Sequence, residues 1–164
     1  MSHKVASATK SGYPAVMSRK TSEVAITAWA RLLRAQQTLL ERVEGDLAAA
    51  ELPPLAWYDV LLELSRVEDG RLRQFEICEK ILLSKYNLSR LLDRLEQEGL
   101  VKRQPCKEDG RAAVVVITAA GKALQKKMWP VYEQAIERHF ARHLTAAEAQ
   151  ELSELLRRVI APTA

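Results

Sequence analysis

Apolar residues recur at helical spacing between Thr21 and Ala50, a stretch that holds no proline and a single glycine, Gly45. This pattern predicts one long amphipathic helix. Pro53 and Pro54 end it, and Pro54 is suited to open a second helix over roughly residues 54–66. The second helix, LAWYDVLLELSR, is apolar on more than one face. A helix of that kind is buried on several sides.

The middle of the chain changes from helical to alternating patterns. Two short helices, near residues 73–81 and 84–98, are joined by a tight turn and predict a helix-turn-helix. Gly99 stands where a helix of this length would end. The sequences LVKRQ and AAVVVIT then predict two strands around a seven-residue loop, Pro105 to Arg111. A β-hairpin directly after a helix-turn-helix is a wing, and we expect it to carry a cationic tip.

The last third is helical again. Thr118 is placed to cap a helix that starts at Ala119 and contains Pro130. Thr145 and Glu148 have the spacing of a capping box for a final helix. Apolar stripes on the helices at both ends of the chain favour a helical dimer interface, although these helices could instead pack on their own domain. The stripe of the final helix consists of Leu152, Leu155, Leu156 and Val159.

Composition narrows the class of protein. The 164 residues contain no run of eighteen apolar positions and no secretory leader, so we expect a cytoplasmic protein. Two cysteines are too few for a disulfide framework. A net charge of +4 leans weakly towards an anionic partner. His139 and His143 share a helix face, but the stretch HFARH lacks the glutamate of a zinc protease motif. No phosphate loop or nucleophile elbow is present, so we predict neither an enzyme nor a cofactor.

Several motifs together resemble the MarR family of bacterial transcription regulators. They are LSRLLDRLEQEGLVKR, EDGRAAVVVIT and AAGK, with support from WYDVLLEL and LTAAEAQEL, and they cover about Thr21 to Val159. The resemblance implies a mainly α fold with a small β-hairpin wing, a homodimer, and a repressor of a palindromic operator that a small aromatic or phenolic ligand releases. Residues 1–20 carry Ser, Lys, Gly and Pro without apolar periodicity, which predicts a flexible basic tail. Together with the resemblance, the pattern divides the rest into a helical dimerisation region (21–52 and 119–164) and a winged helix-turn-helix (53–118).

The wing departs from the family at one position. The family's wing commonly reads Asp-Arg-Arg, whereas this chain has Asp109-Gly110-Arg111. Gly110 eases a turn with positive φ and removes one cation per wing. Operator affinity would then be lower, or more of it would come from Lys107 and the basic tail.

Candidate DNA contacts lie at the start of the second short helix, because the N-terminal residues of a recognition helix reach base edges. Asn pairs with adenine and Lys with guanine or a phosphate, while residues one turn later reach phosphates. The resemblance adds an Arg94–Asp109 pair that braces the wing. Alternatively, the polar side chains form a solvated helix face. The predicted contacts are Ser84, Lys85, Tyr86, Asn87, Ser89 and Arg90 on the helix, with Lys107 and Arg111 on the wing.

The resemblance also implies a ligand pocket between the dimerisation helices and the winged domain. Aromatic walls with a few polar groups suit a planar aromatic acid or phenol. Equally, these aromatic residues could be plain core. Asp59 is unusual, since a carboxylate within an apolar helix needs a partner or lies at a rim. The predicted lining is Trp29, Trp57, Tyr58, Asp59 and Leu62 from the first two long helices, with Met128, Trp129 and Tyr132 from the penultimate one.

Two alternatives remain within the same fold. Cys106 has cationic neighbours in sequence that favour a thiolate, so a thiol-redox regulator is one of them. Cys78 is better explained as a small apolar residue of the core. A winged helix used only for protein contacts is the other, but it would not need a polar, cationic start to its second helix.

Overall fold

A computed structural model describes residues 20–81, 85–105 and 113–161 of the chain. The chain divides into two units, residues 1–34 and 35–164. The long helix α1 (Glu23–Ala49) runs across this division, and its bounds confirm the single long helix that the apolar spacing predicts. In the first unit every described residue except Leu32 is exposed, including the indole of Trp29 at 60%.

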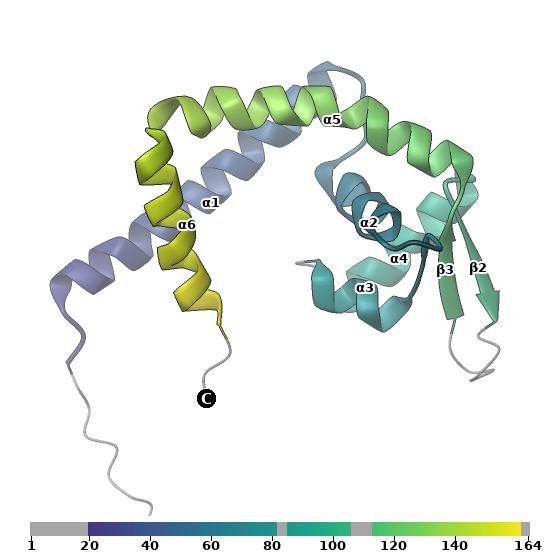
Figure 1. Cartoon of the computed structure of the whole chain (residues 1–164), viewed down its shortest axis with the longest axis horizontal. Helices are drawn as coiled ribbons and strands as arrows, with labels where there is room; N and C mark the ends of the chain where they lie inside the picture. The colour runs from purple at the N-terminus through teal and green to yellow at the C-terminus, as the bar shows by residue number, and fades with distance from the viewer. Residues whose placement is uncertain (1–19, 82–84, 106–112, 162–164) are drawn as a thin grey trace, which may run out of the picture. The chain divides into compact units, whose positions relative to one another are not determined.

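Helix α2 (Leu55–Arg66) follows Pro54 and is buried on several sides, as its composition predicts. Its first turns pack with the end of α1 and with α5 (Ala119–His139) in a core that contains Val43, Leu47, Leu55, Tyr58, Met128 and Ala135. Tyr58 stacks on Trp129 at 6.2 Å between ring centroids and meets Tyr132 edge-on at 5.2 Å. Figure 1 shows α2 lying beside α5.

The opposite side of α2 belongs to a second core. Here α2 packs with α3 (Gln74–Lys80), α4 (Lys85–Gln97) and a small antiparallel sheet. Gly99 has a φ of +68°, and the amide of Leu100 donates to the carbonyl of Leu95 at 2.8 Å, so α4 ends as its sequence predicts. The fully buried members of this core are Val60, Leu61, Leu64, Ile77, Leu88, Leu92, Leu95, Val101 and Val115.

The sheet differs from the expected two-stranded hairpin. Strands β2 (Val101–Pro105) and β3 (Ala113–Ile117) pair antiparallel, as predicted, but β1 (Arg71–Arg73) pairs with the other edge of β3. Leu72 lies opposite Val115 in this pairing. Pro105, predicted to start the loop, is the last residue of β2. The described part of the wing is therefore held by a third strand that precedes the helix-turn-helix.

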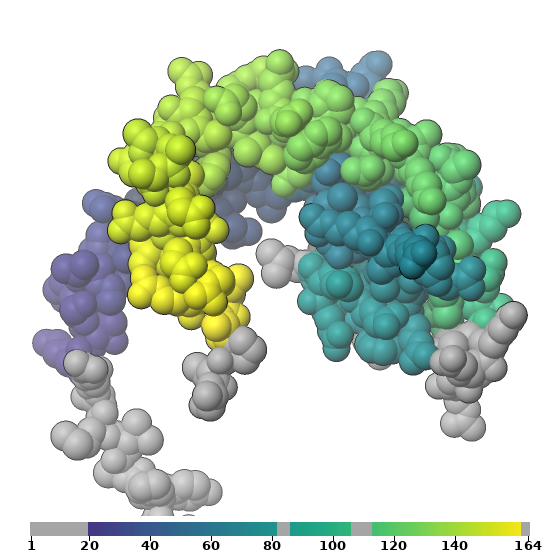
Figure 2. All heavy atoms as spheres, viewed as in Figure 1, coloured from purple at the N-terminus to yellow at the C-terminus, as the bar shows by residue number. Residues whose placement is uncertain are grey.

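The C-terminal segment follows the predicted caps. Thr118 Oγ1 accepts from the amide of Gly121 at 3.1 Å and begins α5, which continues through Pro130. A short 3-10 turn (Ala141–His143) leads to α6 (Ala146–Ile160), where Thr145 and Glu148 form the predicted capping box. Helix α6, all of whose residues are described, contains no buried residue. Figure 2 shows its yellow atoms uncovered on the viewed face.

None of the helices within the described ranges is long and apolar enough to cross a bilayer.

Candidate nucleic-acid interface and pocket

Helix α4 separates its polar and apolar residues cleanly. Leu88, Leu91, Leu92 and Leu95 are buried, which confirms the predicted inner stripe. Tyr86, Asn87 and Arg90 are exposed, and Ser89 is half-buried. The leucines therefore fix the helix on the core and leave its first turns to present polar groups to a partner.

An aromatic and a cation are neighbours on this exposed surface. The guanidinium carbon of Arg90 lies 5.7 Å from the ring centroid of Tyr86, whose side chain is 70% exposed. The contact is within the range of a cation–π interaction, worth about 0.5–1 kcal/mol at an exposed site. It limits the orientations of two long side chains at the start of α4, and so reduces the entropy that each would lose on binding.

Part of the predicted interface lies outside the described residues. Ser84, Lys107, Asp109 and Arg111 belong to that part, as does the basic tail up to residue 19, and Lys85 is described only as the first residue of α4. The proposed Arg94–Asp109 pair is untested for the same reason. The side chain of Arg94 is exposed.

A brace that the sequence analysis missed joins β2 to α4. The guanidinium of Arg103 donates to Asp93 at 2.5 Å, to Glu96 at 3.3 Å and to the carbonyl of Ser89 at 3.2 Å. Its backbone amide also donates to Glu96 at 2.7 Å. The side chain is only 24% exposed. Strand alternation places Arg103 on the same face of β2 as buried Val101. This alternation could have predicted that the side chain of Arg103 faces the protein interior, where α4 lies.

The brace sets the position of the first strand of the wing relative to α4. Charge-assisted hydrogen bonds are stronger than neutral ones, and this arginine makes several at once. One of its acceptors is the backbone carbonyl of Ser89, which is next to the exposed Arg90 in the sequence. The contact therefore holds α4 to β2 close to the polar residues that α4 exposes. Arg103 is thus a positioning residue, whose guanidinium is directed into the protein.

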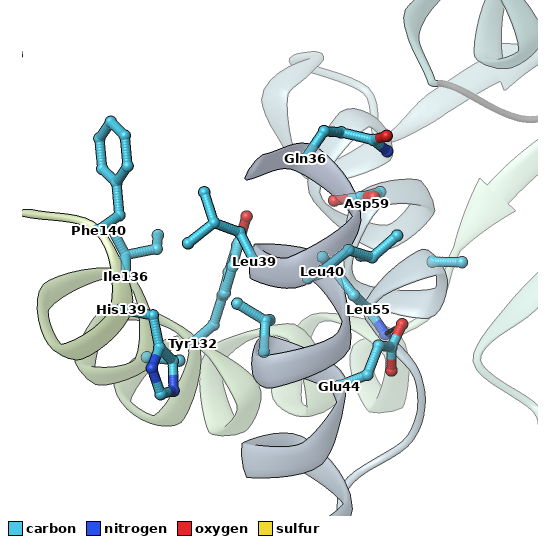
Figure 3. A pocket seen from close by; sticks show the side chains of 13 residues that line it. Gln36, Leu39, Leu40, Glu44, Leu55, Asp59, Tyr132, Ile136, His139 and Phe140 are labelled. Carbon is cyan, nitrogen blue, oxygen red and sulfur yellow. Dashed lines mark hydrogen bonds between the residues drawn. The ribbon is translucent and has the colours of Figure 1, made fainter. Parts of the chain in front are cut away.

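A cavity of about 620 Å³ lies between the second half of α1, the start of α2 and the end of α5. Figure 3 shows Phe140 and His139 on one side of the view and Gln36 and Asp59 on the other. The size is within the range of small-molecule sites. The apolar part of its wall consists of Leu39, Leu40, Val43, Leu55, Ala56, Ala135, Ile136 and Phe140.

The polar part of the wall contains two carboxylates. Glu44 Oε1 accepts from the amide of Leu55 at 3.1 Å and so satisfies a free donor at the start of α2. Asp59 is half-buried. Burial, followed by the charges of Glu44 and Glu63, raises the pKa of Asp59 from 3.8 to about 6. Burial and then Asp59 raise the pKa of Tyr132, which also lines the cavity.

Of the eight residues predicted to line a ligand pocket, Asp59 and Tyr132 line this cavity. Tyr58 and Met128 are buried in the core beside it, and Leu62 packs against the same core. Trp57 packs against the core of the winged part, and Trp29 is exposed in the first unit. The polar lining residues Gln36 and Glu44 were not predicted, and His139 was considered only as a metal ligand, because their proximity depends on how α1 meets α5.

Asp46 ties the helices together next to the cavity. Its carboxylate accepts from Arg138 at 3.2 Å and lies 2.9 Å from Nε2 of His139. Asp46 lies on α1, and its two partners end α5. The imidazole of His139, which lines the cavity, therefore has the carboxylate of Asp46 as its partner.

The two cysteines differ in what the structure describes. Cys78 is half-buried and packs against the core of the winged part, in agreement with an apolar role. Cys106 lies outside the described residues, so the thiol alternative stays a prediction. The described residues contain no group of three potential ligands that could hold a metal ion.

The sequence profile of the MarR family matches residues 51–112, a range that contains the α2–α4 core. Solved structures extend the match. AbsC, a MarR family transcriptional regulator from Streptomyces coelicolor, is 28% identical with a TM-score of 0.76, and the alignment covers 87% of this chain and 95% of AbsC. The chain thus resembles MarR family regulators over most of its length.

Other family members agree over similar lengths. A mutant of MarR from E. coli, solved in complex with operator DNA, is 25% identical with a TM-score of 0.72 over 83% of this chain and 96% of that one. An uncharacterized HTH-type transcriptional regulator from Bacillus cereus is 29% identical over 131 residues, which are 80% of this chain and 85% of the relative. The chain has the fold of MarR family transcriptional regulators, which are DNA-binding proteins and not enzymes.

Proposed function

We propose that this MarR family regulator acts as a homodimeric repressor of a palindromic operator, and that a small aromatic ligand weakens its hold on DNA. The observation that carries the DNA-binding part is the two-sided α4. Its leucines are buried, whereas Tyr86, Asn87 and Arg90 are exposed at its start. Helices with this arrangement enter the major groove by their first turns.

The roles of the α4 side chains follow from their chemistry. Asn87 is suited to pair with adenine, and Arg90 to contact phosphate or a guanine edge. Lys85, Ser84 and Ser89 would add contacts around them, while Lys107 and Arg111 of the wing would reach the flanking minor groove. Arg103 would hold α4 and the wing at a fixed spacing, so that both reach DNA together.

Homodimerisation is supported by apolar side chains that the described chain leaves uncovered. Leu40 of α1 is exposed, and so are Leu155, Val159 and Ile160 on α6. An apolar face without cover is typical of a protein interface. Two copies that share such helices would place two α4 helices on one side of a palindrome, about one helical turn apart.

The ligand part rests on the α1–α2–α5 cavity. Helix α2 contributes Leu55 and Asp59 to the cavity and Leu61 and Leu64 to the core that holds α4. A ligand that binds one arrangement of these helices more tightly than another would shift the spacing of the two α4 helices.

The test is fluorescence anisotropy with labelled DNA from upstream of the chain's own gene. Binding should occur as a dimer, should weaken steeply with salt, and should exceed binding to a scrambled duplex of equal length. Light scattering gives the oligomeric state in the same buffer. Equal affinity for the scrambled duplex, or a monomer that binds as tightly, would contradict the proposal.

A further inference from the structure

The ionisable lining of the α1–α2–α5 cavity is mainly acidic. Glu44 and Asp59 supply carboxylates, and His139 supplies an imidazole. Neither lysine nor arginine occurs among the described residues that line it. The nearby Arg138 is bound to Asp46 and does not belong to the lining.

Two of these three groups already have partners. Glu44 accepts from the amide of Leu55, and His139 contacts Asp46. Asp59 forms no hydrogen bond or ion pair with any residue in the described part of the chain. Within that part, the charged group of the cavity that is left for a ligand is therefore a carboxylate.

We propose that this cavity binds an amine with a large hydrocarbon part. Its ammonium group would lie at Asp59 and its hydrocarbon part against the leucines of α1. This rests on the ligand-responsive regulator proposed above and specifies the charge of its ligand. A half-buried carboxylate without a partner gains most from a charged donor, because both groups are partly removed from water. The ring of Tyr132, which also faces the cavity, would attract the same cation.

The same charges disfavour an aromatic acid. An anionic ligand would meet Asp59 and Glu44 across an apolar wall, where repulsion is stronger than in water. The imidazole of His139 already contacts the carboxylate of Asp46, so it is not left to pair with an anionic ligand. The proposed ligand is thus an amine, in place of the aromatic acid or phenol that the family resemblance implies.

Binding of an amine should depend on pH near 6. Asp59 has a raised pKa of about 6, so it is largely ionised at pH 7 and largely protonated at pH 5. An ammonium group needs the ionised form, and the affinity should therefore fall about tenfold between pH 7 and pH 5. The ionisable groups near Asp59 are Glu44 from α1, Tyr58 and Glu63 from α2, and Tyr132 from α5, while His139 lines the other side of the cavity.

The test is calorimetry of the full chain with three naphthalene probes of similar size. They are 2-naphthylmethylamine, 2-naphthylmethanol and 2-naphthoate, and the charges of the amine and the acid stay nearly constant between pH 5 and pH 7. At pH 7 the amine should bind at least tenfold more tightly than the acid, with the alcohol between them. Below pH 6 the advantage of the amine should shrink.

Asp59→Asn and Glu63→Gln form a matched pair, because each removes one carboxylate from α2. Glu63 lies one turn further along and does not line the cavity, being paired with Arg66 and Lys80. Asp59→Asn should lose both the amine preference and the fall towards pH 5. Glu63→Gln should keep the preference.

The proposal is overturned if 2-naphthoate binds as tightly as the amine, if the amine does not bind, or if Asp59→Asn keeps the amine preference. Because calorimetry is done without DNA, it is separate from the proposed function. An amine that binds through Asp59 but leaves the anisotropy of the DNA complex unchanged would support the amine site and refute ligand-controlled release.

Discussion

Gly121 offers the sharpest stability prediction, because an added Cβ at this position would lie 2.2 Å from the carbonyl oxygen of Leu100 and 2.9 Å from Cγ1 of Ile117. The carbonyl of Leu100 cannot move freely, since it accepts from the backbone amide and the hydroxyl of Thr118 at 3.0 Å each. We expect Gly121→Ala to cost about 1–3 kcal/mol in overpacking and about 1 kcal/mol for each hydrogen bond that it weakens. The better helix propensity of alanine returns about 1 kcal/mol. With both hydrogen bonds weakened, the free energy of unfolding should fall by about 2–4 kcal/mol as the net of these terms.

Gly45→Ala is the matched control, because Gly45 is also inside a helix and an added Cβ would meet nothing within 4 Å. It should raise the free energy of unfolding by about 0.5–1 kcal/mol. Urea unfolding, followed by tryptophan fluorescence, measures both variants, and one fixed protein concentration keeps any contribution from subunit association the same. If Gly121→Ala is as stable as the wild type, the start of α5 is not packed as closely against Leu100 and Ile117 as described.

Four further predictions concern the interface, the cavity and assembly. Arg103→Ala should lower operator affinity without changing the salt slope in anisotropy titrations, because its guanidinium contacts Asp93 and Glu96 rather than phosphate; a slope reduced by one unit would make it a DNA contact. Asn87→Ala should relax discrimination at one base pair per half-site by about 1–3 kcal/mol, with the salt slope unchanged. Because the raised pKa means that folded protein holds the Asp59 proton more tightly than unfolded protein, this carboxyl destabilises the fold as pH rises from about 4 to about 6. Asp59→Asn should therefore be more stable at pH 7 by about 1 kcal/mol, after discounting for solvent, and no more stable at pH 3.5, as urea unfolding at both pH values would show. Ending the chain after Leu144 removes α6 and should give monomers or aggregates by light scattering, with loss of DNA binding; a soluble truncated dimer would contradict the proposed interface.

Local signals in the sequence were enough for the helices. Pro54, Gly99, Thr118 and the pair of Thr145 and Glu148 mark helix ends through their own backbone chemistry, and the structure has helix ends at those places. Each signal acts within a few residues, so it can be recognised without knowing the fold.

Features that depend on distant pairing were missed. Strand β1 has only three residues, and it forms because β3, more than forty positions later, offers a free edge. The brace at Arg103 requires the side chains of α4 and β2 to meet, and the cavity requires α1 to meet α5. Alternation and charge limit such contacts, but they do not determine which elements lie together.

The two-sided burial of α2 has a consequence for how this regulator could diversify. Asp59 faces the cavity, whereas Val60, Leu61 and Leu64 pack in the core that supports α4. If the cavity binds the amine proposed above, substitutions at Asp59 would change the preferred ligand and leave the residues of α4 that are proposed to read DNA unchanged. Substitutions at the leucines would instead disturb the reading of DNA whichever molecule is sensed. With the proposed ligand site, a lineage that carries this helix would acquire new signals for an unchanged set of genes by altering very few positions.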